Sequence, residues 1–191
     1  MRKLVRLIGS VLAPLLAAAL LGLSSPAHAD DPRSAEVLDQ LFAALRSAED
    51  PATAHELDRA IWAVWTNPSD PELHKRMRAV LYARGIGNIA QALRLLDTLV
   101  VDYPDYAEGW NQRATIHYMM GNLDLSLADC ARVLELEPRH FGALSGRALI
   151  YLAQGKRALA LKDMTAALAI HPFLSERRYF PELDRPPATQ I

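Results

Sequence analysis

Apolar side chains recur along the chain at helical spacing. Near the start, Leu38, Leu41, Phe42 and Leu45 follow the i, i+3, i+4, i+7 pattern of an amphipathic helix. The chain then breaks at residues 50–51, where a proline follows an aspartate. A second apolar face begins after the break, and its members are Leu57, Ala60, Ile61, Val64 and Trp65. The pattern therefore predicts a helical hairpin over residues 33–66.

Six further helices are predicted after a turn cluster at residues 67–71. Asp70 is placed to cap the first of them, and Pro71 occupies the first helical position, where a proline is tolerated. The predicted helices pair as 71–84 with 88–101, 106–119 with 123–136, and 140–153 with 157–170. The short connections make the two helices of each pair antiparallel neighbours.

These pairs repeat with a period of 34 residues. Each unit has a glycine at the turn between its helices, a proline that closes it, and a small residue where the two helix axes approach. These positions are Gly87, Gly121, Gly155, Pro104, Pro138, Pro172, Ala92, Ser126 and Ala160. A fixed period of this length indicates a helical repeat array, in which one hairpin cannot bury its apolar stripe alone and neighbours must stack. The units run at about 71–104, 105–138 and 139–172.

This spacing resembles that of the tetratricopeptide repeat (TPR) family, and the stretch from Trp110 to Pro138 is its clearest copy. The resemblance covers residues 71–172. It implies an all-α fold, a right-handed α-solenoid of three TPR helical hairpins with an N-terminal helical-hairpin cap. Arg113 and Arg147 each stand 16 residues before an aspartate, so we expect an ion pair between the two helices within each of repeats two and three; the alternative is that these are independent surface charges.

Residues 30–70 fit the period weakly and are expected to form that divergent cap, because a terminal unit has an outer face exposed to water. Trp62 and Trp65 are expected to cover the edge of the first repeat; the alternative is a patch that docks a partner. Residues 173–191 contain prolines that forbid a long helix. A short helical turn at 174–179 is expected to seal the last repeat, before a disordered tail.

Residues 1–29 have the features of a cleaved secretory signal peptide. Three basic residues precede an apolar run from Leu7 to Leu23, and Ala27-His28-Ala29 matches a cleavage site, with the cut between Ala29 and Asp30. The alternative is an uncleaved membrane anchor, since the apolar run has about the length of a short span. Cleavage would place the mature chain in the periplasm of a bacterial cell.

Removing the signal changes the charge balance. The segment holds three of the 21 basic residues and none of the 22 acidic ones, which leaves 18 basic and 22 acidic residues. A net negative chain argues against nucleic acid as a partner, because nucleic-acid binding needs a basic surface. Contact with a membrane is expected only through the signal segment, if that segment stays uncleaved. The single cysteine, Cys130, allows no internal disulfide.

The chain shows no catalytic motif. It lacks an H-E-x-x-H pattern, a glycine-rich phosphate loop and a G-x-S-x-G turn. Its histidines never pair at i, i+4 on one predicted helix, so we expect no metal site and no cofactor. We expect packing roles for His117 and Cys130, because a nucleophilic cysteine would need a base and a cationic neighbour. These observations predict that the protein is not an enzyme.

The TPR resemblance implies that the first helix of each repeat lines a concave ligand-binding face. Carried over by the 34-residue phase, this face consists of Met77, Leu81, Arg84, Glu108, Asn111, Thr115, Tyr118, Ser145, Leu149 and Leu152. The set is mostly apolar or neutral and contains no lysine, so it does not match the family subtype that clamps a carboxylate. Alternatively, these residues form an ordinary solvated surface or are covered by the N-terminal hairpin and the tail.

The sequence therefore predicts a non-catalytic protein–protein interaction module of the cell envelope, which binds an unidentified peptide or protein on its concave face. One alternative is a structural or assembly subunit of an envelope complex, or a self-associating protein. Another is a small enzyme or ligand-binding protein whose site would be a deep pocket with converging titratable groups.

Overall fold

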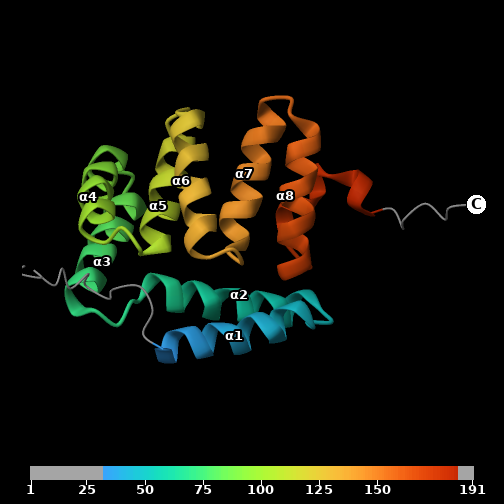
Figure 1. The fold of residues 1–191 in the computed structure, drawn as a ribbon, viewed down its shortest axis with the longest axis horizontal. Coiled ribbons are helices and arrows are strands. Elements are labelled where there is room, and N and C mark those ends of the chain that lie inside the picture. Colours follow the sequence, from blue (N-terminus) through green and yellow to red (C-terminus); the bar gives the residue numbers. More distant parts are fainter. Residues whose placement is uncertain (1–31, 185–191) are drawn as a thin grey trace, which may run out of the picture.

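The computed structural model describes residues 32–184, which form eight α-helices, two short 3-10 helices and no strand (Figure 1). The α-helices are α1 (Pro32–Arg46), α2 (Pro51–Thr66), α3 (Pro71–Gly85), α4 (Ile89–Asp102), α5 (Ala107–Met119), α6 (Leu123–Leu136), α7 (Phe141–Ala153) and α8 (Arg157–Ile170). The 3-10 helices are η1 (Ser175–Tyr179) and η2 (Pro181–Asp184). The predicted signal peptide lies outside the described residues. No helix within the described range is long and apolar enough to cross a membrane.

Helices α3 to α8 form three antiparallel hairpins that stand side by side in one row (Figure 1). The fold is the predicted all-α solenoid of three hairpins. The turn between each pair contains a glycine with positive φ: 75° at Gly87, 77° at Gly121 and 70° at Gly155. In the first turn, the Asn88 N–H donates to the Ala83 carbonyl at 2.8 Å and the Gly87 N–H donates to Arg84 at 3.0 Å. These two hydrogen bonds close the C-terminal end of the helix, and glycine adopts the required positive φ at little cost.

Within each hairpin the axes approach at the small residues. Ala92, Ser126 and Ala160 are at most 1% exposed, and the Ser126 hydroxyl donates to the Ala114 carbonyl at 2.8 Å. Asp70 caps α3 by accepting a hydrogen bond from the Leu73 N–H at 2.7 Å, with the proline at the first position as predicted.

The predicted ion pairs between the helices of repeats two and three are present. Arg113 donates two hydrogen bonds to Asp129, at 2.8 and 2.7 Å, and Arg147 donates two to Asp163, at 2.6 and 2.9 Å. The hydrogen bonds that the arginines donate to the aspartates raise the pKa of both arginines. Arg113 also contacts Asp97 of α4 at 3.3 Å, so it ties repeat two to repeat one.

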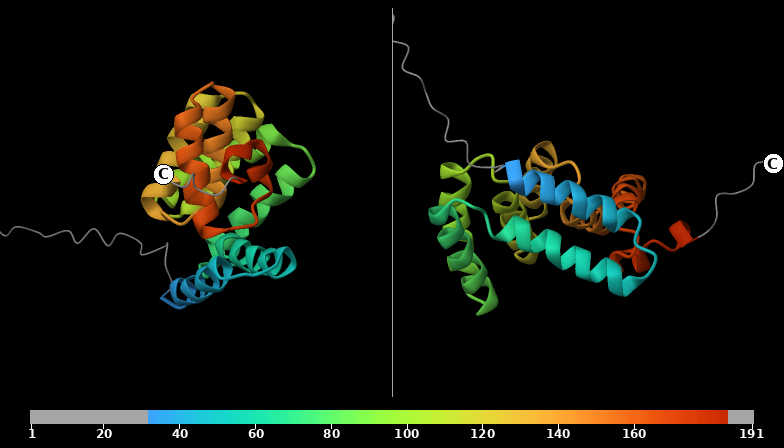
Figure 2. Two further views of the ribbon diagram at one scale, coloured as in Figure 1. Left: turned by 90° about the vertical axis from the view of Figure 1, so that its right-hand side faces the viewer. Right: turned by 90° about the horizontal axis from the view of Figure 1, so that it is seen from below.

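The N-terminal hairpin of α1 and α2 lies across the lower ends of the row of repeats (Figures 1 and 2). Its apolar side packs on Phe141 at the start of α7 and on Ile170 at the end of α8. This position differs from the predicted one, in which Trp62 and Trp65 cover the edge of the first repeat. The reason is local: at the phase of Phe141 the first repeat has Leu73 instead of an aromatic ring.

The C-terminal segment lies against the third repeat. Phe180, between η1 and η2, is fully buried in a core cluster with Ala148 and Met164 of α7 and α8. Arg157 of α8 lies over the Phe180 ring at 5.0 Å and donates two hydrogen bonds to Glu182, at 2.7 and 2.5 Å. The predicted disordered end lies beyond the described residues.

Candidate binding surface on the concave face

A shallow groove runs between α5 and α7, the first helices of repeats two and three. Its cavity has a volume of about 50 Å³ and is lined by Asn111, Ala114, Thr115, Tyr118, Ser126, Cys130, Gly142, Gly146, Leu149 and Ile150. Four of these residues belong to the predicted concave face: Asn111, Thr115, Tyr118 and Leu149. The structure therefore brings part of the predicted set together in one groove.

The accessible part of the predicted set lies toward the upper half of the helices. Tyr118 is 44% exposed, and Thr115 and Leu149 are half-buried. Leu81, Arg84 and Leu152 are also half-buried. Arg84 donates a hydrogen bond to the Gln112 side-chain oxygen at 2.6 Å, so its guanidinium spans from α3 to α5. A partner would meet Tyr118 and Leu149 first.

The structure corrects the exposure expected for four residues, which are fully or nearly buried, although Asn111 still contributes to the lining of the groove. Met77 is fully buried in the core between α3 and α4. Glu108 is 1% exposed, and Asn111 and Ser145 are each 6% exposed. The prediction assigned positions by phase alone, whereas the lower ends of α5 and α7 are covered by the α1–α2 hairpin.

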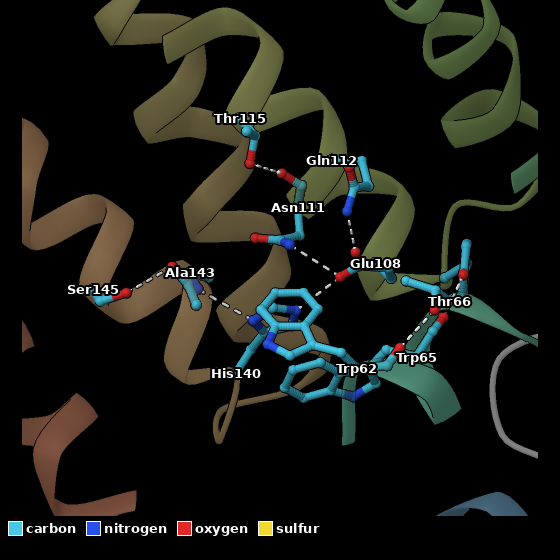
Figure 3. Close-up of polar contacts among 12 residues, drawn as sticks. Trp62, Trp65, Thr66, Glu108, Asn111, Gln112, Thr115, His140, Ala143 and Ser145 are labelled. Atoms are coloured by element: carbon cyan, nitrogen blue, oxygen red, sulfur yellow. Dashed lines mark hydrogen bonds and ion pairs between the residues drawn. The ribbon is translucent and has the colours of Figure 1, made fainter. Parts of the chain in front are cut away.

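Glu108 is the centre of a buried polar cluster at the base of the groove (Figure 3). Its carboxylate accepts hydrogen bonds from the Asn111 amide at 3.0 Å, the Gln112 amide at 2.5 Å and His140 Nε2 at 3.1 Å. Glu108 also lies in the first turn of α5, where the helix dipole favours negative charge. A buried carboxylate needs such partners, because burying even a neutral polar group without a hydrogen bond costs roughly 2–7 kcal/mol and an isolated charge costs more.

His140 has a defined tautomer. It caps the start of α7, and its Nδ1 accepts a hydrogen bond from the Ala143 N–H at 3.2 Å. Since Nδ1 is an acceptor, the ring proton of the neutral imidazole is on Nε2 and points at Glu108. His140 therefore joins the start of α7 to the start of α5, through one hydrogen bond at each ring nitrogen.

The two tryptophans of α2 cover this cluster (Figure 3). Trp65 stacks on the His140 ring, and Trp62 meets the same ring edge-on with centroids 5.5 Å apart. The Tyr106 hydroxyl donates to the Trp65 carbonyl at 2.5 Å, and burial raises the pKa of Tyr106 far above its ordinary value. The hairpin thus closes the lower end of the groove, as in the alternative in which the hairpin covers the concave face.

Sequence reasoning did not find His140. The residue belongs to no motif, and its partners come from α2, α5 and α7. Only the pairing of a first-turn acid in one repeat with a capping histidine in the next would have suggested the contact. Trp62 and Trp65 were singled out, but their partner was placed on the wrong repeat.

The remaining candidate reactive side chains, Cys130 and His117, have packing roles. Burial raises the pKa of the Cys130 thiol to about 11, so at neutral pH it packs as a small apolar group, as predicted. His117 is 8% exposed and packs near Asp129. Within residues 32–184 no group of three or more histidine, cysteine or acidic side chains could hold a metal ion.

Comparison with known proteins defines the class. A family model described as tetratricopeptide repeat matches twice, over residues 77–138 and 112–175, and the two matches together span more than half of the chain. The fold and these matches define a helical-repeat, protein–protein interaction module. The chain belongs to the tetratricopeptide repeat family.

Two related sequences are similar to this chain. A TPR repeat-containing protein of Rhizobium etli is 39% identical over 135 residues, which cover 71% of this chain and 66% of the relative. The rat (Rattus norvegicus) DnaJ homolog subfamily C member 3 is 31% identical over 110 residues, covering 58% of this chain and 21% of the relative. The chain thus spans just under two thirds of the first relative and about a fifth of the second.

Two crystal structures of MamA are similar in shape. The first has a TM-score of 0.48 and 18% identity, covering 80% of this chain and 83% of that one. The second has a TM-score of 0.47 and 17% identity, covering 82% of this chain and 80% of that one.

Proposed function

We propose that the protein is an exported interaction module that holds a segment of a partner protein in the groove between α5 and α7. The observation that carries the proposal is the groove itself: Tyr118 and Leu149 are accessible on its two walls, while the α1–α2 hairpin closes its lower end. A groove bounded at one end and open at the other limits where a bound segment can lie. Binding requires no covalent step.

The lining of the groove defines the kind of segment it accepts. Among the residues that line it, Ala114, Leu149 and Ile150 are apolar, Tyr118 is amphipathic, and none carries a charge. A Cβ added at Gly146 would meet nothing within 4 Å, so a partner can approach the α7 backbone closely. These features fit an apolar segment, extended or helical, that contributes one or two large side chains.

The proposed location is the periplasm. It rests on the sequence of residues 1–29, which has the features of a signal peptide with cleavage between Ala29 and Asp30. Edman sequencing or an intact-mass measurement of the protein purified from cells identifies the first residue of the mature chain and so tests the cleavage. A chain that begins at Asp30 supports export with cleavage, and a chain that retains residues 1–29 contradicts it.

Site-specific photo-crosslinking in cells tests the groove. A photoreactive phenylalanine analogue at Tyr118 is expected to crosslink a partner protein, whereas the same analogue at Val101, a 75% exposed position on α4, is not. The double variant Tyr118→Ala and Leu149→Ala is expected to lose partner capture while keeping the helical circular dichroism of the parent. Equal crosslinking from both positions, or full capture by the folded variant, would contradict the groove.

A structural role in a larger assembly is the second candidate. The turns at the upper end of the row carry exposed apolar side chains: Ile86 at 59%, Met119 at 57% and Met120 at 50%. Such side chains at adjacent repeat tips are typical of a surface that is covered by another protein or another copy. Light scattering after size-exclusion chromatography would show a defined oligomer in that case and a monomer for the binding module alone.

A further inference from the structure

A second pocket lies where α2, the start of α7 and η1 meet. It has a volume of about 270 Å³, and its walls include Trp62 of α2, Phe141 at the start of α7 and Phe173 after α8. Two carboxylates also line it, Asp58 of α2 and Glu176 of η1. The pocket thus combines aromatic rings with acidic groups.

The charges in this pocket are unbalanced. Among the described residues that line it there is no lysine or arginine, and its other ionisable members are His55 and His171. Burial lowers the pKa of His171, so the ring is neutral at pH 7. Burial also raises the pKa of Asp58, and the negative charge of Glu176 acts in the same direction. Two acidic groups therefore share a pocket with no permanent positive charge between them.

One carboxylate oxygen at the pocket is free to accept a hydrogen bond from a ligand. Asp58 Oδ1 accepts a hydrogen bond from Trp62 Nε1 at 3.0 Å, but within the described residues Oδ2 accepts none. His171 is 6% exposed, and its Nδ1 accepts from the Phe173 N–H at 3.3 Å, which leaves the proton on Nε2. The Nε2 atom lies 3.8 Å from Asp58 Oδ1, beyond hydrogen-bond distance. The second oxygen of Asp58, Oδ2, thus borders the pocket without a hydrogen-bond donor and can accept one from a cationic ligand.

We propose that this pocket binds the guanidinium of an arginine side chain on a partner protein. The carboxylates of Asp58 and Glu176 supply the negative charge, and the Trp62 and Phe173 rings supply faces on which a planar cation stacks. A guanidinium is more weakly hydrated than an ammonium group and bonds carboxylates with two parallel N–H groups, so it suits a half-buried acidic pocket better than lysine does. The proposal does not depend on the groove between α5 and α7.

A titration with N-acetyl-arginine amide tests it, because the probe presents the side chain alone. The structure has three tryptophans, and the indole N–H signal of Trp62 in a ¹H–¹⁵N spectrum reports directly on the pocket through its bond to Asp58. We expect a saturable shift of this signal. The neutral isostere N-acetyl-citrulline amide is expected to give no shift, and N-acetyl-lysine amide is expected to bind several-fold more weakly.

Charge-removing variants give the matched controls. Asp58→Asn combined with Glu176→Gln should weaken the apparent affinity at least tenfold, whereas Glu56→Gln, an exposed acid on the same helix outside the pocket, should not change it. Tyr118→Ala, which alters the groove, should leave the titration unchanged. If the double variant does not fold, Glu176→Gln alone decides by the same comparison. A response to citrulline equal to that of arginine, no saturation, equal affinity for lysine, or parent affinity in the charge-removing variant would overturn the proposal.

Discussion

Trp65 stacks face to face on His140, with ring centroids 4.0 Å apart and the planes 6° from parallel. His140 in turn bonds Glu108, so one contact connects the N-terminal hairpin to the first helices of repeats two and three. Because the contact buries a polar cluster, the hairpin is part of the folded core of the repeat domain. It also fixes the lower limit of the groove that we propose as the binding site.

The fit of the hairpin depends on a glycine in α7. A Cβ at Gly142 would lie 2.8 Å from the Trp62 ring, whereas a Cβ at Gly146, one turn further along the same helix, would meet nothing within 4 Å. Gly142→Ala is therefore expected to lower the free energy of unfolding by roughly 1–3 kcal/mol through overpacking. Gly146→Ala is expected to raise it by roughly 0.5–1 kcal/mol, because alanine is the better helix former.

Urea unfolding followed by circular dichroism measures both variants. Fluorescence gives a second readout for Gly142→Ala, since displacement of Trp62 changes the environment of its indole. Equal effects of the two substitutions would show that the hairpin does not press on α7 at this point.

The ion pairs inside repeats two and three allow an internal comparison. The side chain of Asp163 is 6% exposed and that of Arg147 is 22% exposed, so water screens the pair only partly. A double-mutant cycle with Arg147→Met and Asp163→Asn is expected to give a coupling of roughly 0.5–1 kcal/mol. The exposed pair of Lys75 and Glu72, 3.6 Å apart, is the control and is expected to couple more weakly. A coupling energy of zero between Arg147 and Asp163 would show that the ion pair does not stabilise the fold.

The repeats could be predicted from the sequence because their determinants are local. A glycine with positive φ, a small residue at the crossing and a proline at the end act within a single hairpin, and the 34-residue period shows them three times. The interhelical ion pairs followed from the same period, since Arg113 and Arg147 occupy equivalent positions.

The position of the hairpin could not be predicted in this way. It depends on the match between Trp62 and a single glycine, Gly142, and on an aromatic ring, Phe141, that stands where repeat two has alanine. Neither feature repeats, so the period carries no information about it. The same contact explains why Glu108 is buried although its phase placed it on the concave face.

Cys130 is expected to react slowly with alkylating reagents. Burial raises the pKa of its thiol to about 11 from an ordinary value near 9, so its thiolate population at pH 8 is about 100-fold below that of a free cysteine. Mass spectrometry after timed exposure to iodoacetamide measures the rate, with the urea-unfolded protein as the reference. Native and unfolded chains reacting at the same rate would mean that α6 opens frequently.

The titration of His171 predicts how stability changes with pH. Burial lowers the pKa of this histidine in the folded state, so between that lowered pKa and about 6.5 the unfolded chain binds a proton that the folded chain does not. The free energy of unfolding therefore rises with pH through this window and falls as the solution is made more acidic. Burial raises the pKa of Asp58, so its contribution to the free energy of unfolding falls as the pH rises. This effect is confined to the pH window just above 3.8.

His171→Gln isolates this contribution, because glutamine keeps a polar side chain without a charge change near pH 6. Urea unfolding of the parent between pH 5 and 7.5 is expected to show a steeper loss of stability on the acid side than the same series on the variant. The acidic groups Asp58 and Glu176 and the exposed His55 surround the ring and are common to both proteins, so the difference between the two series belongs to residue 171. Parallel curves would mean that His171 is protonated as easily in the folded chain as in the unfolded one.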